Sequence, residues 1–317
     1  MIAQLKNHTE IHLAAWDVLV ANSPQGCIFM FSWYINAMLQ NWQGIVVHDK
    51  NYNLLAVMPL QIKSKYFLEY SMQPVLAKYW GICFAKTTFP NYYEEYSWKK
   101  KIVEAVISAI PKNLAKFHTN FSPAFDYILP FYWKSFKPET RFTYILALKN
   151  ASGNVEDNFS KSVVKKIRKA NKNEIIIKEE KSFDLLFQLF AENENAKKII
   201  LPKAYYLDYK NIFKACMEHG NGFALSAFNE KNEGIASGFF LQDSHTTYFL
   251  SGIVSPAYRQ SAAMNLLVTE ALKIASQDTK QFDFLGSMME SIESFFRSFG
   301  PKPVPYLAVE KNKLPFM

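Results

Sequence analysis

Residues 291–306 read SIESFFRSFGPKPVPY, and residues 128–144 read ILPFYWKSFKPETRFTY. Aligned without a gap, Tyr132–Phe136 falls on Phe295–Phe299, and Pro138 falls on Pro301. Both copies therefore carry two aromatics, a cation, a serine and a phenylalanine, and then a proline two positions on. The same phrase written twice, 163 residues apart, indicates a repeated structural unit.

The elements expected around each copy have the same order: helix, hairpin, strand, helix, strand, helix, strand. In the first half they are expected at residues 23–42, 44–62, 80–84, 98–110, 114–122, 125–136 and 142–148. In the second half they are expected at residues 203–218, 222–241, 246–254, 261–276, 281–287, 290–299 and 304–309. The sequence therefore predicts an α/β protein with mixed sheets and an internal duplication, with domains at residues 1–142 and 143–317.

Three stretches of the second half resemble the acyltransferase domain of FemAB-type proteins, which belong to the GNAT superfamily. FSKSVVKKIRKANKNEIIIK (159–178) is similar to the family's opening basic helix and strand. YFLSGIVSPAYRQSAAMNLLVTEALKIA (248–275) is similar to its donor-site strand, loop and helix, and FDFLGSMMESIESFFRSFG (282–300) to its closing strand and helix. The resemblance implies two tandem GNAT-like, acyl-CoA N-acyltransferase-type domains, the first of them degenerate and the second carrying the donor site.

The resemblance also implies where an acyl donor would bind. In GNAT proteins the loop at the place of residues 255–264 holds pyrophosphate on backbone N–H groups at a helix N-terminus. Here that loop reads SPAYRQSAAM, with alanine and methionine in place of the family's small, flexible residues. The residues expected to contact the donor are Arg259, Ser261, Ala262 and Asn265, with Ser261 as the first residue of the helix.

A basic helix precedes this region. Lys161, Lys165 and Arg168 recur at helical spacing on one face, and residues 161–172 contain no acidic residue. Like charges at this spacing repel each other unless an anion is near. The pattern predicts either a phosphate-binding face for the donor or substrate, or a solvated polar face opposite an apolar stripe.

Three residues are expected at the reaction centre. Tyr248 and Ser251 lie on the strand that leads into the donor loop, and the resemblance implies that Arg297 faces the reacting groups. A cation there would neutralise donor phosphate or the negative charge that develops on the carbonyl oxygen. The alternative for Arg297 is a surface arginine near a helix C-terminus, where the helix dipole favours cations.

The composition excludes several classes of protein and of binding site. Three separate cysteines without a CxxC pattern and six histidines without ligand spacing predict no disulfide framework and no metal site. The net charge of +8 favours anionic partners. With no apolar run long enough to span a membrane, the expected location is the cytoplasm; no DNA partner is predicted, and the oligomeric state is left open.

Two functions remain at this stage. The first is an acyl- or aminoacyltransferase that moves an acyl group from acyl-coenzyme A or aminoacyl-tRNA to an amine acceptor, such as a peptidoglycan precursor or an amino sugar. The alternative is a non-catalytic binding protein on a decayed double acyltransferase fold. The absence of a long insertion weakens the case for transfer RNA as a partner.

Overall fold

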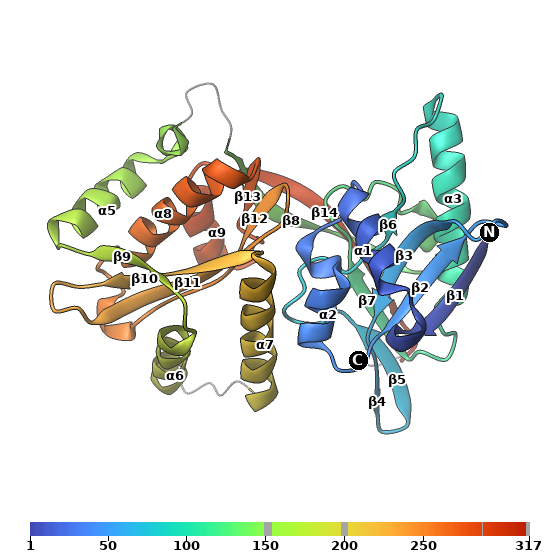
Figure 1. Ribbon diagram of the computed structural model, residues 1–317, viewed down its shortest axis with the longest axis horizontal. Coiled ribbons are helices and arrows are strands. Elements are labelled where there is room, and N and C mark those ends of the chain that lie inside the picture. The colour runs from blue at the N-terminus through green and yellow to red at the C-terminus, as the bar shows by residue number, and fades with distance from the viewer. Residues whose placement is uncertain (149–153, 198–201, 287, 315–317) are drawn as a thin grey trace. The chain divides into compact units, whose positions relative to one another are not determined.

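The computed structural model describes residues 1–148, 154–197, 202–286 and 288–314 of the chain (Figure 1). These residues form two compact units. Unit 1 contains Met1–Arg141 together with the C-terminal residues from Pro305 onwards, and unit 2 contains Phe142–Val304. No helix in the described ranges is both long and apolar enough to cross a membrane.

Unit 1 contains a four-stranded antiparallel sheet in the order β1-β2-β3-β6 and a second group of strands in the order β4-β5-β7-β14. The strands of the first sheet are β1 (Ile2–Asn7), β2 (Gln43–His48), β3 (Leu54–Leu60) and β6 (Cys83–Phe84). Those of the second group are β4 (Ile62–Lys65), β5 (Leu68–Met72), β7 (Lys116–Asn120) and β14 (Lys302–Asn312). The helices are α1 (Leu13–Asn22), α2 (Ser32–Met38), α3 (Tyr92–Ala109) and α4 (Leu129–Trp133).

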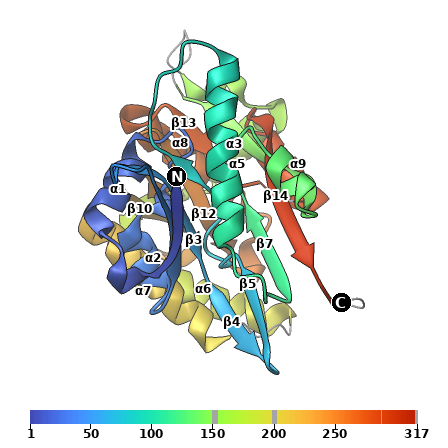
Figure 2. The same cartoon turned by 90° about the vertical axis from the view of Figure 1, so that its right-hand side faces the viewer.

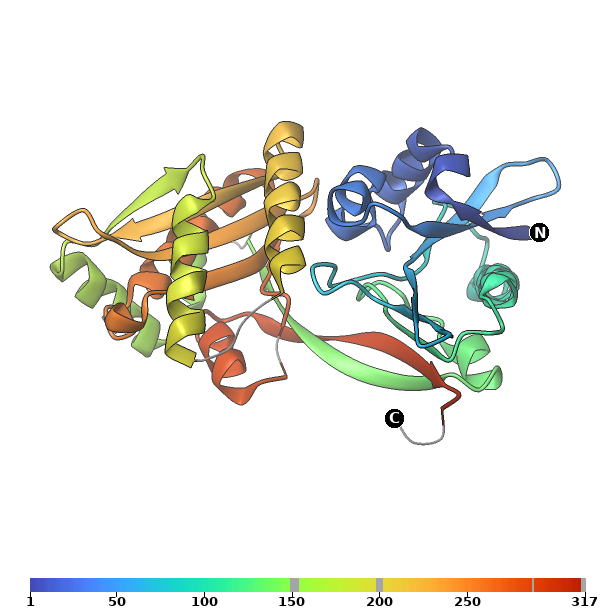
Figure 3. The same ribbon diagram turned by 90° about the horizontal axis from the view of Figure 1, so that it is seen from below.

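Side-chain alternation along β2 and β3 explains why both faces of the first sheet are covered. Ile45 and Met58 belong to the core cluster that also contains Val103 of α3. Gly44 points to the other face, where a Cβ atom would lie 2.7 Å from the ring of Trp16 in α1. Because successive strand residues face opposite sides, α1 and α3 cover opposite faces of the sheet, as Figures 2 and 3 show.

Unit 2 is built on one mixed sheet in the order β8-β13-β12-β11-β10-β9, in which the β12–β13 pair is parallel and the other pairs are antiparallel. Its strands are β8 (Lys137–Ala147), which belongs to this unit from Phe142 onwards, β9 (Ile176–Glu180), β10 (Gly222–Phe228), β11 (Gly234–Gln242), β12 (Thr246–Val254) and β13 (Gln281–Asp283). Its helices are α5 (Lys161–Lys172), α6 (Asp184–Lys197), α7 (Lys203–His219), α8 (Ala263–Asp278) and α9 (Glu290–Arg297).

Both faces of this sheet are also covered. Phe240 of β11 packs in the core that includes Leu267 of α8. Its neighbour Phe239 points the other way and lies against Phe183 and against Tyr209 of α7. Figure 1 accordingly shows α5 and α8 on one side of the sheet and α6 and α7 on the other.

The predicted order of elements is present in both halves. The hairpins β2–β3 and β10–β11 are followed by β6 and β12, then by α3 and α8, β7 and β13, and α4 and α9. The repeated phrase spans the end of α4 in one half and the end of α9 in the other. Its last residue is buried in each case, Phe136 at 5% exposure and Phe299 at 0%. The phrase therefore supplies the same core contact twice.

The unit to which the last strand belongs differs from the prediction, in which all of residues 143–317 form the second domain. β14 pairs with β7 of unit 1, with Ala308 opposite Asn120, whereas β8 pairs with β13 of unit 2, with Ile145 opposite Asp283. Each unit thus receives the strand that follows the closing helix of the other. Val309 is fully buried in the core of unit 1, which explains why the C-terminal residues belong to that unit. The hairpin β4–β5 was not predicted.

Candidate functional site

The free edge of β12 is the first element of the candidate site. On one side β12 pairs with β11 along its length, with a register shift that places Phe249 opposite Phe240 but Ser251 opposite Phe239. Leu250 is therefore the extra residue of a β-bulge, which turns the following residues of the strand. On the other side β13 pairs only with Thr246–Tyr248. Within the described ranges no strand covers that side beyond Tyr248, so its backbone groups can pair with an extended ligand.

The N-terminus of α8 is the second element. The helix begins at Ala263, and its N-cap is Ala262, which adopts the left-handed conformation at φ 65° and ψ 13° with no side-chain cap. The predicted first residue, Ser261, instead lies before the cap, and its Oγ accepts a hydrogen bond from the N–H of Ala263 at 3.2 Å. The helix therefore starts two residues later than predicted, because the chain turns at Ala262, whereas the hydrogen bond to Ala263 agrees with the capping role expected of Ser261. The expected contact between Ser261 and a donor remains a prediction. An uncapped helix N-terminus is favourable for an anion.

The loop between β12 and α8 is held in place on two sides. Asn193 of α6 donates to the carbonyl oxygen of Val254 at 2.9 Å, and its Oδ1 accepts from Arg259 at 3.4 Å. Tyr258 donates to Glu233 in the β10–β11 turn at 2.8 Å, and this hydrogen bond raises the pKa of Tyr258. The predicted donor residue Arg259 is exposed and is positioned by a buried amide.

The basic helix reaches the same loop. α5 begins after the N-cap Ser160, and residues 155–158 before it form a separate short 3-10 helix. Lys169 donates from Nζ to the carbonyl oxygen of Gln260 at 2.9 Å. Lys165 lies one turn before Lys169 on the helix, whereas Lys161 lies two turns before it. The structure thus brings the basic face to the loop through Lys169, which was not among the predicted site residues.

Lys161, Lys165 and Arg168 are all exposed. None of the three forms an ion pair among the described residues, so their charges are available to an anion. Which of them meets a ligand remains a prediction.

Asn265 lies in the first turn of α8 and is 5% exposed. Its amide Nδ2 has no hydrogen-bond partner among the described residues. Most buried polar groups in folded proteins are hydrogen-bonded, and one that is not calls for an explanation. A ligand at the start of α8 would supply the missing acceptor, in line with the predicted role of Asn265 in donor binding.

The two predicted catalytic residues of β12 have different surroundings. Tyr248 is buried, and its hydroxyl donates to Asp243 at 2.7 Å in the turn before the strand, where Asp243 also accepts two backbone N–H groups. Ser251 lies after the bulge, and its hydroxyl is hydrogen-bonded to the hydroxyl of Tyr209. The Tyr248 hydroxyl is therefore engaged by the turn before β12. Ser251, in contrast, provides a hydroxyl on the part of β12 that has a free edge.

Tyr209 was missed by the sequence analysis. It lies in α7 and is 1% exposed, and its burial raises the pKa of the phenol. The phenol therefore keeps its proton at neutral pH and can donate it to the Oγ of Ser251, whose own proton then points elsewhere. The aromatic spacing of Tyr205 and Tyr209 in α7 is typical of a core stripe, so nothing in the sequence pattern indicates this contact.

Arg297 ends α9, and its side chain is 65% exposed. Its Nε donates to Oε1 of Glu293 at 2.8 Å, and the hydroxyl of Tyr144 donates to the same oxygen at 3.0 Å. Burial, together with this hydrogen bond to Glu293, raises the pKa of Tyr144. The guanidinium is thus held at its Nε, while its two terminal nitrogens form no hydrogen bond among the described residues.

The corresponding place in unit 1 is built differently. The side chain of Asn91 caps α3 by accepting from the N–H of Glu94 at 3.0 Å, and Glu94 and Glu95 occupy the first turn. A capped N-terminus with two carboxylates disfavours phosphate. At the start of α8, by contrast, the N-cap residue provides no side-chain cap, Ser261 accepts only from the N–H of Ala263, and no carboxylate lies in the first turn.

Comparisons with known proteins agree with this geometry. Residues 157–291 match the family model described as acetyltransferase (GNAT) domain. This part of unit 2 is similar to a GNAT domain. The match includes the basic helix α5, the free edge of β12 and the start of α8, and so all but Arg297 of the predicted site residues. No curated protein matches the sequence.

Solved structures extend the likeness beyond the GNAT domain to both units. The crystal structure of FemX is similar over 97% of this chain and 97% of that chain, with 14% identity and a TM-score of 0.68. A tandem GNAT protein from the clavulanic acid biosynthesis pathway is similar over 99% and 100%, with 9% identity and a TM-score of 0.56. L-PGS from Bacillus licheniformis is similar over 86% and 85%, with 8% identity and a TM-score of 0.50. The predicted fold of two GNAT-like domains is confirmed, and the likeness to FemX, at 14% identity, is a likeness of fold.

No group of three or more histidine, cysteine, aspartate or glutamate side chains in the described residues could hold a metal ion. The residues near the GNAT site are instead a backbone edge, a helix N-terminus, hydroxyls and cations. These groups suit the binding of an anionic donor and acyl transfer, because such transfer needs hydrogen-bond donors for phosphate and for a developing oxyanion.

Proposed function

We propose that this chain is an N-acyltransferase whose GNAT domain binds an acyl thioester of coenzyme A and transfers the acyl group to a primary amine. The observation that carries the proposal is the free edge of β12, which runs through a fixed loop into the uncapped N-terminus of α8. One end of this element offers backbone groups to an extended chain, and the other offers N–H groups to phosphate.

Three further features support a phosphate-bearing donor. Lys169 reaches the carbonyl of Gln260, and Lys165 lies one turn away on the same helix. The buried amide of Asn265 lacks a partner among the described residues. Ala262 holds the turn without a bulky side chain, which allows the ligand to approach the backbone.

The reaction needs little from the protein beyond positioning. The amine nitrogen attacks the thioester carbonyl carbon, the carbon–sulfur bond breaks, and the thiolate leaves. An α-amino group with a pKa of about 8 is partly unprotonated at neutral pH, so a strong general base is optional. The developing oxyanion requires hydrogen-bond donors, and we assign this role to N–H groups on the free edge of β12.

Stabilisation of the leaving thiolate is assigned to Ser251. Tyr209 keeps its proton and donates a hydrogen bond to the Oγ of Ser251, so the serine hydroxyl can donate a hydrogen bond to the leaving sulfur. The proton lost by the attacking nitrogen passes through water to the thiolate. Arg297, held by Glu293, is assigned to charge neutralisation, with its terminal guanidinium nitrogens toward the anion.

Aminoacyl-tRNA is the second donor class, because the cations of α5 suit any phosphate chain. The acceptor classes to test first are peptidoglycan precursors and amino sugars, which the resemblance to FemAB-type proteins implies.

A thiol-release assay tests the proposal. Wild-type protein is incubated with acetyl- or longer acyl-coenzyme A and a panel of amines, and free coenzyme A is measured with a thiol reagent, with charged tRNA as a separate arm. The background from the protein is low because Cys27, Cys83 and Cys216 are buried, and burial raises the pKa of Cys83 to about 12. We expect amine-dependent release of thiol from at least one acyl-coenzyme A.

Binding is measured alongside turnover. A donor present at 100 times its Kd stabilises the folded protein by about 2.7 kcal/mol. Donor binding without turnover for any amine would favour the binding-protein alternative. A protein that neither binds nor turns over either donor class would refute the proposal.

A further inference from the structure

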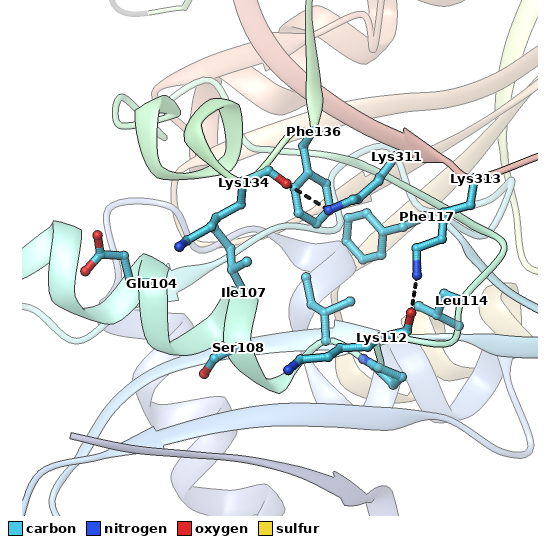
Figure 4. Close-up of a pocket in the computed structure, with 12 residues that line it drawn as sticks. Glu104, Ile107, Ser108, Lys112, Leu114, Phe117, Lys134, Phe136, Lys311 and Lys313 are labelled. Atoms are coloured by element: carbon cyan, nitrogen blue, oxygen red, sulfur yellow. Dashed lines mark hydrogen bonds between the residues drawn. The ribbon is translucent and has the colours of Figure 1, made fainter.

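Unit 1 contains a cavity that has no part in the proposed acyl transfer. It lies beside the C-terminal part of α3 and is bordered by β7, the end of α4 and the end of β14 (Figure 4). Its volume is about 470 Å³. Cavities of about 300–1,000 Å³ are typical of small-molecule sites, so this one is large enough for a ligand.

The inner wall of the cavity is apolar. Leu114, Phe117 and Phe136 are each exposed by 5% or less and belong to the core of unit 1. Ser108 is the one hydroxyl in the lining, and it donates to the carbonyl of Ala105 at 2.7 Å. A nucleobase placed here would lose its hydrogen bonds to water without replacement, whereas an apolar chain would gain by leaving water.

The rim of the cavity is basic. It carries the side chains of Lys112, Lys134, Lys311 and Lys313, as Figure 4 shows. Lys311 donates from Nζ to the carbonyl oxygen of Lys134 at 2.8 Å and lies 4.7 Å from the centre of the Phe136 ring. Lys313 donates to the carbonyl oxygen of Lys112. An ammonium has three N–H groups, so both lysines are fixed by one bond and keep donors for a ligand.

The four lysines lack carboxylate partners. None of them forms an ion pair within the described part of the chain. Glu104 is the one carboxylate in the lining, and it lies 3.9 Å from Lys100. Four like charges around one apolar cavity repel each other unless an anion is bound between them.

We propose that this cavity binds a single-chain anionic amphiphile, with the apolar chain against Phe117 and Phe136 and a phosphate or carboxylate head group at the lysine rim. The apolar wall favours an apolar chain, and the four ammonium groups without carboxylate partners favour an anionic head group. This site shares no residue with the donor site, so its test does not depend on the proposed acyl transfer.

Isothermal titration calorimetry with decyl phosphate and decanoate, each below its critical micelle concentration, tests the site. Decanol and inorganic phosphate serve as the neutral and chain-free probes. We expect one of the two amphiphiles to bind at least tenfold more tightly than decanol or phosphate. Tighter binding of decyl phosphate identifies a phosphate head, and tighter binding of decanoate identifies a carboxylate head. Equal binding of decanol, or no binding of either amphiphile, would overturn the proposal.

A pair of charge-matched variants locates the binding. The side chains of Lys112 and Lys134 form no hydrogen bond of their own in the described structure, so the double substitution Lys112→Gln/Lys134→Gln keeps both carbonyl contacts. It is expected to weaken amphiphile binding at least tenfold. The control, Lys50→Gln/Lys63→Gln, removes two exposed lysines elsewhere in unit 1 and is expected to leave binding unchanged. Equal affinities of the two double variants would show that the rim is not the site.

Discussion

Replacing Ala262 by aspartate is a sharp test of the anion site at the start of α8. Ala262 is the N-cap of the helix and adopts the left-handed conformation, with no side-chain cap. Aspartate and asparagine adopt this conformation more readily than other non-glycine residues, and a carboxylate at a helix N-terminus favours the helix. Neither Ala262→Asp nor Ala262→Asn should therefore lower the free energy of unfolding, and the asparagine variant is the matched neutral control.

The size of the effect follows from the distance between the charges. A phosphate bound to N–H groups of the first turn would lie about 6 Å from a carboxylate at position 262. Two unit charges at that distance repel by about 2.8 kcal/mol at an effective dielectric constant of about 20. Solvent at this half-buried position reduces the figure, so we expect about 1.4–2.8 kcal/mol, a tenfold to hundredfold loss of affinity.

Titration calorimetry with coenzyme A measures the effect, and thermal unfolding of each variant shows whether the fold is kept. Ala262→Asn should bind coenzyme A within about threefold of the wild type, and Ala262→Asp at least tenfold more weakly. Equal affinities of the two variants at equal stability would refute the placement of the phosphates at α8.

Three further predictions concern single side chains. Lys169→Gln should weaken coenzyme A binding severalfold while Lys161→Gln, two turns away, should change it less, as calorimetry would show; the reverse order would mean that contact with Gln260 does not mark the ligand-facing part of α5. Tyr209→Phe should lower kcat at least tenfold with little change in donor Kd, because it removes the hydrogen-bond donor that orients the Ser251 hydroxyl; an unchanged kcat in steady-state assays would remove this pair from the mechanism. Arg297→Met should leave the free energy of unfolding within about 1 kcal/mol, as surface changes usually do, while donor affinity or transfer rate falls at least tenfold; unchanged binding and turnover would reduce Arg297 to the surface partner of Glu293.

The sequence predicted the fold through the repeated phrase, because its final phenylalanine fills the same core position in both units. It did not predict which sheet each closing strand joins. β8 and β14 follow equivalent helices with similar apolar patterns, and only tertiary pairing decides that Ile145 lies opposite Asp283 and Ala308 opposite Asn120. The pattern of apolar residues within a strand does not indicate whether that strand pairs within its own unit or with the sheet of the other unit.

The same limit applies to the candidate site. The resemblance to FemAB-type proteins placed the donor loop at residues 255–264 and the start of its helix at Ser261, two residues before α8 begins. It could not locate Lys169, because which lysine of α5 meets the loop depends on how α5 packs on α8. Tyr209 was missed because its contact with Ser251 joins residues 42 apart in sequence. Ala262 gave no local signal either, since a left-handed turn usually carries glycine.

Hydrogen–deuterium exchange with and without saturating coenzyme A tests the central claim most directly, because it maps donor binding onto the backbone. Donor binding at this site should slow exchange at residues 249–254, on the free edge of β12, and at residues 259–266, where α8 begins. Residues 91–95, at the capped start of α3 in unit 1, should exchange at the same rate in both samples. Protection at the start of α3, with none at β12 and α8, would contradict the account.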